Sequence, residues 1–254
     1  FSIADLRTSP VFTGMQSNNF ENNDCLTGVY FPDSMTGMIS DNFFGCGELK
    51  EVYFGTGMKK MTSDNFDACP KLEKVVLQEG FEQMTQFNFR NCVNLSGFAL
   101  PSTMKIMTDG NFWECDNLTL GPVTQGLLTV TKGFTNIGDK NWYNCDGINE
   151  LLIESGFKGV IETGNWESAN QITDVYILTD EAGARFGNGN FKQAASIENV
   201  YINCPTGCWI GTGNFVNANQ ISNIYINSAY FADYTINGTW SGRQDIVAGA
   251  EMIS

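Results

Sequence analysis

An asparagine followed by a large aromatic residue occurs nine times in this chain of 254 residues. The steps between successive pairs are 23, 23, 23, 23, 30, 24, 25 and 24 residues. The pairs are Asn19-Phe20, Asn42-Phe43, Asn65-Phe66, Asn88-Phe89, Asn111-Phe112, Asn141-Trp142, Asn165-Trp166, Asn190-Phe191 and Asn214-Phe215. A period of this length is typical of a solenoid, in which each small unit buries its apolar face only against its neighbours.

Three apolar positions follow each pair at fixed spacing. The first lies six residues after the aromatic residue, and the next two lie three and five residues further on, as in Leu49, Val52 and Phe54. This is the L-x-x-L-x-L strand segment of a leucine-rich repeat, and its alternation predicts a short strand with one buried face. Stacked at about 4.8 Å, these strands predict a continuous, curved parallel sheet. We expect about nine rungs of 23–25 residues, with short second strands or turns on the other side.

A second apolar column lies four residues before each asparagine. Its members are Met15, Met38, Met61, Met84, Met107, Ile137, Ile161, Phe186 and Ile210. A methionine stripe can form an adaptable binding groove, but the register with the repeat favours core filling. The asparagine side chains are expected to hydrogen-bond to buried backbone groups of a turn.

The domain organisation follows from where the period holds. Residues 1–227 are predicted to form one solenoid, with residues 1–18 as a partial first repeat. The 30-residue step fits an inserted loop around Thr119 to Gly126. After Asn227 the period fails, and residues 228–254 are expected to fold over the open end as a C-terminal cap within the same structural domain.

Composition limits the possible functions. The net charge of −14 argues against nucleic-acid partners and against anionic membranes. No apolar run reaches the roughly 18 residues of a membrane-spanning helix. The chain contains no histidine, which removes the commonest general base and metal ligand. It begins at Phe1 without a signal peptide, as expected of a processed or trimmed chain.

Five of the eight cysteines occupy one position, three residues after the aromatic residue. The later units carry alanine there, so the position requires a small buried group. The Cβ vectors of stacked neighbours run parallel, and free thiols are therefore predicted for Cys46, Cys69, Cys92, Cys115 and Cys145. Cys204 and Cys208 could bridge a small loop, and Cys25 is expected to be unpaired. No zinc-binding spacing is present, so neither a metal nor a cofactor is predicted.

The segments NFFGCGELKEVYF, SDNFDACPKLEKVVL and NFRNCVNLSGFAL resemble the BspA-type leucine-rich repeat. The resemblance covers about residues 12–227, although the last three units replace cysteine by alanine and leucine by isoleucine. It implies a secreted or cell-surface protein, of bacteria or some protists, that works in adhesion and protein binding. It brings no catalytic residues.

The residues between the buried strand positions point outward, where a ligand could bind. The outward column carries three successive tyrosines between asparagines near the C-terminal end, and two tyrosines near the N-terminal end. Rigid rings and adaptable amides suit an extracellular protein or glycan, whereas stacking for sheet stability is the structural alternative. The ligand-binding candidates are Tyr176, Tyr201, Tyr225, Asn199, Asn203, Asn223, Asn227, Tyr30 and Tyr53.

Three functions follow, in order of preference. The first is a non-enzymatic surface binding or adhesion module that uses the outward face of the sheet. The second is a polysaccharide lyase or hydrolase on a parallel β-helix, for which Glu150, Glu154 and Asp174 could supply paired carboxylates, although an acidic solvated face is the favoured explanation of these residues. The third is a passive surface stalk.

Overall fold

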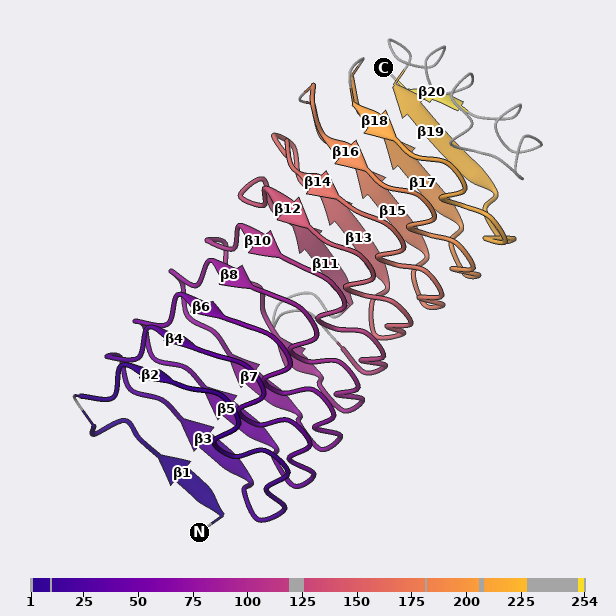
Figure 1. Ribbon diagram of the computed structural model, residues 1–254. Coiled ribbons are helices and arrows are strands. Elements are labelled where there is room, and N and C mark those ends of the chain that lie inside the picture. The colour runs from indigo at the N-terminus through magenta and orange to yellow at the C-terminus, as the bar shows by residue number, and fades with distance from the viewer. Residues whose placement is uncertain are drawn as a thin grey trace.

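The chain forms a solenoid of stacked turns, here called rungs, without any helix in its described part (Figure 1). The computed structural model describes residues 2–9, 11–118, 126–180, 182–205 and 208–227, together with the backbone of residues 251–253. All strand pairing within the described residues is parallel, and strands pair with their counterparts in the next rung everywhere except between β9 and β11, whose bounds are given below. The predicted leucine-rich-repeat solenoid is confirmed.

One side of the solenoid is a sheet of nine two-residue strands, one for each Asn-aromatic pair. The methionine column supplies its buried residues, so the prediction of core filling is confirmed. The strands are β2 (Gly14–Met15), β4 (Gly37–Met38), β6 (Lys60–Met61), β8 (Gln83–Met84), β10 (Ile106–Met107), β12 (Asn136–Ile137), β14 (Val160–Ile161), β16 (Arg185–Phe186) and β18 (Trp209–Ile210).

The other side carries the leucine-rich-repeat strands in two sheets. The five-stranded sheet contains β1 (Ile3–Asp5), β3 (Gly28–Tyr30), β5 (Glu51–Tyr53), β7 (Lys74–Val76) and β9 (Gly97–Phe98). The six-stranded sheet contains β11 (Leu127–Val130), β13 (Glu150–Ile153), β15 (Asp174–Ile177), β17 (Asn199–Ile202), β19 (Asn223–Asn227) and β20 (Glu251–Ile253).

The prediction of one continuous sheet on this side is therefore wrong. The interruption between β9 and β11 coincides with the 30-residue step, where seven extra residues separate one rung from the next. The strand before the interruption, β9, has only two residues. The expected loop falls on residues 119–125, which lie outside the described residues.

The core is a stack of identical positions from successive rungs. The aromatic residues of the nine pairs form one ladder of near-parallel rings, with centroids 5.0–6.2 Å apart from Phe20 to Phe215. From Phe43 to Phe215 these residues are buried, as are the strand positions between them, such as Val52 and Val200. Repeated inward chemistry therefore builds the fold.

The asparagines form a buried hydrogen-bonded ladder beside the aromatic ladder. In the rung of Asn88, the side-chain amide donates to the Thr85 carbonyl at 3.1 Å and to Oδ1 of Asn111 at 3.1 Å. Its own Oδ1 accepts from the amide of Asn65 at 3.2 Å. The expected role of these asparagines in satisfying the turn backbone is confirmed.

The cysteine column is buried and reduced, as predicted for Cys46, Cys69, Cys92, Cys115 and Cys145. Each thiol also donates to the backbone carbonyl of the aromatic residue in the preceding rung, at 2.8–3.1 Å. Burial in apolar surroundings raises the pKa of these thiols above the usual range of a free cysteine. Cys25 is exposed and unpaired.

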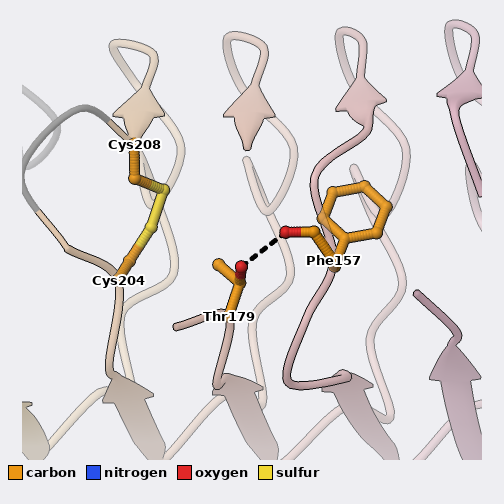
Figure 2. Close-up of a disulfide and its surroundings, with 4 residues drawn as sticks. All are labelled: Phe157, Thr179, Cys204 and Cys208. Atoms are coloured by element: carbon orange, nitrogen blue, oxygen red, sulfur yellow. Dashed lines mark hydrogen bonds between the residues drawn. A yellow bond between two sulfur atoms is a disulfide. The ribbon is translucent and has the colours of Figure 1, made fainter. Parts of the chain in front are cut away.

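The connection from β17 to β18 is closed by a disulfide between Cys204 and Cys208, whose Cα atoms lie 6.0 Å apart (Figure 2). The disulfide that the sequence analysis considered possible for these two cysteines is therefore present. One rung earlier, the hydroxyl of Thr179 occupies the position equivalent to Cys204 and donates to the Phe157 carbonyl at 2.6 Å (Figure 2). The same corner is therefore fastened by a covalent bond in one rung and by a hydrogen bond in another.

The sheets begin and end beyond the nine repeats. β1, from the partial first repeat, pairs with β3, and β20 pairs with β19 through Tyr225 opposite Glu251. The expected C-terminal cap of residues 228–254 lies outside the described residues, apart from the backbone of β20.

Candidate binding surface

Three of the candidate tyrosines form a file on the outward side of the six-stranded sheet. Tyr176 on β15 pairs with Tyr201 on β17, which pairs with Tyr225 on β19. The rings of Tyr176 and Tyr201 stack with centroids 4.7 Å apart, and those of Tyr201 and Tyr225 are 4.6 Å apart. The period-2 alternation of the strands therefore places the three rings side by side, as expected.

Rows of amides flank this file on both sides. On one side, Asn223 Nδ2 donates to Asn199 Oδ1 at 2.8 Å, and Asn199 Nδ2 donates to Asp174 Oδ1 at 2.8 Å. On the other side, Asn227 Nδ2 donates to Asn203 Oδ1 at 2.8 Å. These seven residues, Tyr176, Tyr201, Tyr225, Asn199, Asn203, Asn223 and Asn227, are here called the tyrosine–asparagine face.

The ring faces within the file are largely covered, because each ring stacks on the next and Leu152 precedes Tyr176 in the register. The three hydroxyl groups remain available to a ligand, because none of them donates a hydrogen bond to another residue in the described part of the chain. Burial, followed by the charge of Asp174, raises the pKa of Tyr176, and burial also raises the pKa of Tyr201. Both hydroxyls are thus protonated donors at neutral pH. The face offers hydroxyl edges and amides.

The other two candidates, Tyr30 on β3 and Tyr53 on β5, form a separate pair in the five-stranded sheet. Their rings stack at 4.9 Å, and both hydroxyls donate to the Glu51 carboxylate. This hydrogen bond raises the pKa of Tyr30. The nine candidate residues therefore divide into two groups, because the sheet is interrupted between them.

Charged residues that the sequence analysis did not single out surround the N-terminal pair. The guanidinium of Arg7 lies 4.7 Å from the centre of the Tyr30 ring, and Lys74 Nζ lies 5.2 Å from that of Tyr53. A cavity of about 410 Å³ lies beside the pair and is lined also by Asp33. Glu51 and Lys74 occupy the same outward position in neighbouring strands. Opposite charges at this position in successive repeats could have identified them in the sequence.

Two of the three carboxylates considered for catalysis, Asp174 and Glu154, are engaged in structural contacts. Asp174 accepts from the Thr173 hydroxyl at 2.7 Å as well as from Asn199. Glu154 accepts from the backbone N–H of Lys132 at 2.8 Å. Within the described ranges, no group of three or more histidine, cysteine, aspartate or glutamate side chains is placed to hold a metal ion. The same residues include no helix that could span a membrane.

Comparison with known proteins agrees with this architecture. The sequence matches the family described as BspA type leucine rich repeat region, with six copies, over residues 13–127 and 125–239. The leucine-rich repeat protein of T. pallidum, a solved structure, is similar to the chain, with a TM-score of 0.59 and 18% identity, covering 82% of this chain and 83% of that one.

A leucine-rich cell surface protein from Faecalibacterium prausnitzii A2-165 aligns with a TM-score of 0.48 and 15% identity, covering 97% of this chain and 86% of that one. No protein of curated function matches the chain. At 18% identity, the likeness to the T. pallidum structure establishes the fold alone.

Proposed function

The chain belongs to the BspA-type leucine-rich repeat family, and from this premise we propose that it is a non-catalytic binding module of the cell surface or extracellular space. It recognises an extracellular protein or glycan through the tyrosine–asparagine face. The single observation that carries this proposal is the unbroken file of three tyrosine hydroxyls between two rows of amides on the outward side of the sheet. Such a surface combines rigid rings with adaptable hydrogen-bonding groups, as in other recognition surfaces.

The position of this face on the fold supports a binding role. In a solenoid the inward positions are committed to the core, whereas outward positions are free to differ between rungs. Here the outward column changes from Thr129 and Leu152 to three successive tyrosines. The change extends over neighbouring strands, so an extended ligand could contact several rungs at once.

An extracellular location is supported by the disulfide between Cys204 and Cys208, because disulfides form and persist in oxidising compartments. A bacterial surface is the setting that we propose. A non-catalytic role is supported by the absence of histidine and by the structural contacts of Asp174 and Glu154. The passive stalk is the competing proposal, since stacked tyrosines also stabilise a sheet.

The test is a binding screen against extracellular-matrix proteins and glycans, followed by replacement of Tyr176, Tyr201 and Tyr225 with phenylalanine together. Phenylalanine keeps the stacked rings and removes only the hydroxyls. We expect the melting temperature to stay within a few degrees of the wild type. The affinity should fall at least about tenfold, or 1.4 kcal/mol, since each lost hydrogen bond costs about 1 kcal/mol.

The control is the Tyr30→Phe/Tyr53→Phe variant, which removes the same groups from the separate N-terminal pair and should bind as the wild type does. Equal binding by all three proteins would place the ligand elsewhere. A screen without any ligand would favour the stalk. Carboxylate-dependent turnover of a polysaccharide would overturn the non-catalytic role.

A further inference from the structure

A second recessed site lies at β14, β16 and β18 of the nine-stranded sheet. Figure 1 shows these three strands side by side. Its volume is about 300 Å³, and it is lined by Val160, Glu162, Thr163, Arg185, Gly187, Asn188 and Trp209. None of these residues belongs to the tyrosine–asparagine face, which lies on the six-stranded sheet. The site therefore needs an explanation of its own.

An exposed indole ring forms the apolar part of this site. Trp209 is 47% exposed, whereas Trp142 and Trp166, two tryptophans of earlier rungs, are fully buried. Pairing of β16 with β18 sets Arg185 directly beside Trp209, and the guanidinium carbon lies 5.5 Å from the ring centre. The Arg185 guanidinium therefore packs over the indole ring, while much of Trp209 stays accessible to solvent.

Hydrogen-bonding groups of both kinds surround the ring. Asn188 Oδ1 accepts from the backbone N–H of Thr212 at 2.9 Å, which fixes the orientation of the side chain. Its amide nitrogen donates to no other described residue and keeps two N–H groups for a ligand. Glu162 is exposed and supplies acceptors. Glu162 and Arg185 form no ion pair with any residue in the described ranges, so both keep their hydrogen-bonding capacity for a ligand.

A glycine also lines the site. In the register of β14 with β16, Val160 pairs with Arg185, which aligns Glu162 with Gly187 two residues later. Gly187 has no side chain, and a Cβ there would lie 2.6 Å from the backbone carbon of Glu162. The glycine therefore lets the two rungs approach closely where its backbone lines the site.

From this arrangement we propose that the site binds a neutral saccharide unit. One face of a sugar ring presents apolar C–H groups, which pack on an indole, and its hydroxyls pair with a carboxylate, an amide and a guanidinium. The site carries one negative charge, on Glu162, and one positive charge, on Arg185. Because these charges balance, the site favours neither a polyanion nor a polycation. The volume lies at the lower end of the roughly 300–1,000 Å³ found for small-molecule sites, which limits the ligand to about one or two rings.

The test uses the whole chain on an array of neutral and acidic saccharides, and the strongest neutral binder is then titrated calorimetrically. Trp209→Ala removes the platform, and we expect the affinity to fall at least about tenfold. Trp209→Phe keeps an aromatic ring and should retain most of the binding. Glu162→Gln keeps the side-chain shape, removes the charged acceptor, and should weaken binding severalfold. Thermal melting checks that each variant is folded.

Two further results would separate this site from the proposed function. The Tyr176→Phe/Tyr201→Phe/Tyr225→Phe variant should bind the saccharide as tightly as the wild type does. A saccharide whose affinity is the same in Trp209→Ala and the wild type would overturn the assignment, as would an array on which no neutral saccharide binds. Loss of the protein ligand in the tyrosine variant alone would leave the saccharide site untouched.

Discussion

At the scale of single residues, each rung depends on two backbone positions with left-handed dihedral angles. One precedes the asparagine and the other follows the aromatic residue by two positions. All thirteen non-glycine residues with positive φ in the described ranges occupy these two positions, and Phe87 and Glu114 are examples. This backbone costs a non-glycine residue roughly 1–2 kcal/mol. The cost is tolerated because the asparagine and aromatic ladders fix the corner between them.

A pair of glycine replacements measures this cost. Gly110 and Gly189 both have φ of 62°, but a Cβ at position 110 would lie 2.4 Å from the Phe87 ring, whereas at position 189 the nearest atom is 3.8 Å away. Gly189→Ala should lower the free energy of unfolding by about 1–2 kcal/mol through backbone strain alone. Gly110→Ala should cost about 1–3 kcal/mol more, because the methyl group displaces a ring. Urea denaturation of both variants gives the comparison, and equal losses would show that the corner at Phe87 relaxes freely.

Inward residues could be predicted from sequence because the same side chain recurs at the same position in each rung. The buried asparagines, the methionine column and the free thiols of Cys69 and Cys92 followed in this way. The hydrogen bonds from the thiols to the preceding rung could not be predicted from the sequence. Alanine replaces cysteine in the later rungs, which indicates only that the position requires a small side chain. Trp209 was missed because the residue type at its repeat position changes from rung to rung, for example to Arg185 in the rung before. The repeat pattern therefore gave no reason to single it out.

At the scale of the element, the asparagine corner joins the two strand sets of each rung. Asn88→Ala removes donors to Thr85 and Asn111 and leaves buried partners unpaired. We expect a loss of about 2–4 kcal/mol in the free energy of unfolding. Asn19→Ala removes equivalent contacts, to Gln16 and Asn42, at an exposed position of the first repeat, and water can replace them there.

The Asn19→Ala loss should therefore stay below about 1 kcal/mol. Chemical denaturation of the two variants in parallel supplies the measurement. Similar losses for Asn19→Ala and Asn88→Ala would show that the ladder contributes little beyond its local turn.

The sequence predicted which segments form strands, but it did not predict that β9 and β11 would fail to pair. The alternation around Val75 and that around Leu128 are alike in sequence, and each forms a strand. Whether neighbouring rungs pair depends on their approach in space across the 30-residue step, which no single repeat encodes. The tyrosine–asparagine face was predicted as one file because it lies wholly within one sheet. Tyr30 and Tyr53 belong to the other sheet and are separate from it.

At the scale of the whole molecule, the interruption divides the solenoid on one side only. The nine-stranded sheet continues through β10 and β12, and backbone and side-chain hydrogen bonds join Asn111 to Asn141 at 3.0–3.1 Å. The ring spacing between Phe112 and Trp142 is 6.2 Å, the widest in the aromatic ladder. Because the stability of a repeat array is a sum over rungs and nearest-neighbour interfaces, this interface should be the weakest coupling in the chain.

Matched core replacements test the division. Ile202→Ala in the six-stranded sheet and Leu49→Ala beside the five-stranded sheet each empty a fully buried site, and each should cost about 2–5 kcal/mol. We expect Ile202→Ala to accelerate amide hydrogen exchange mainly in β13 to β19, and Leu49→Ala mainly in β3 to β7, because destabilisation spreads poorly across the weak interface. Mass spectrometry of exchanged peptides resolves the two halves. Uniform acceleration along the chain in both variants would mean that the continuous sheet and the two ladders couple the halves into one cooperative unit.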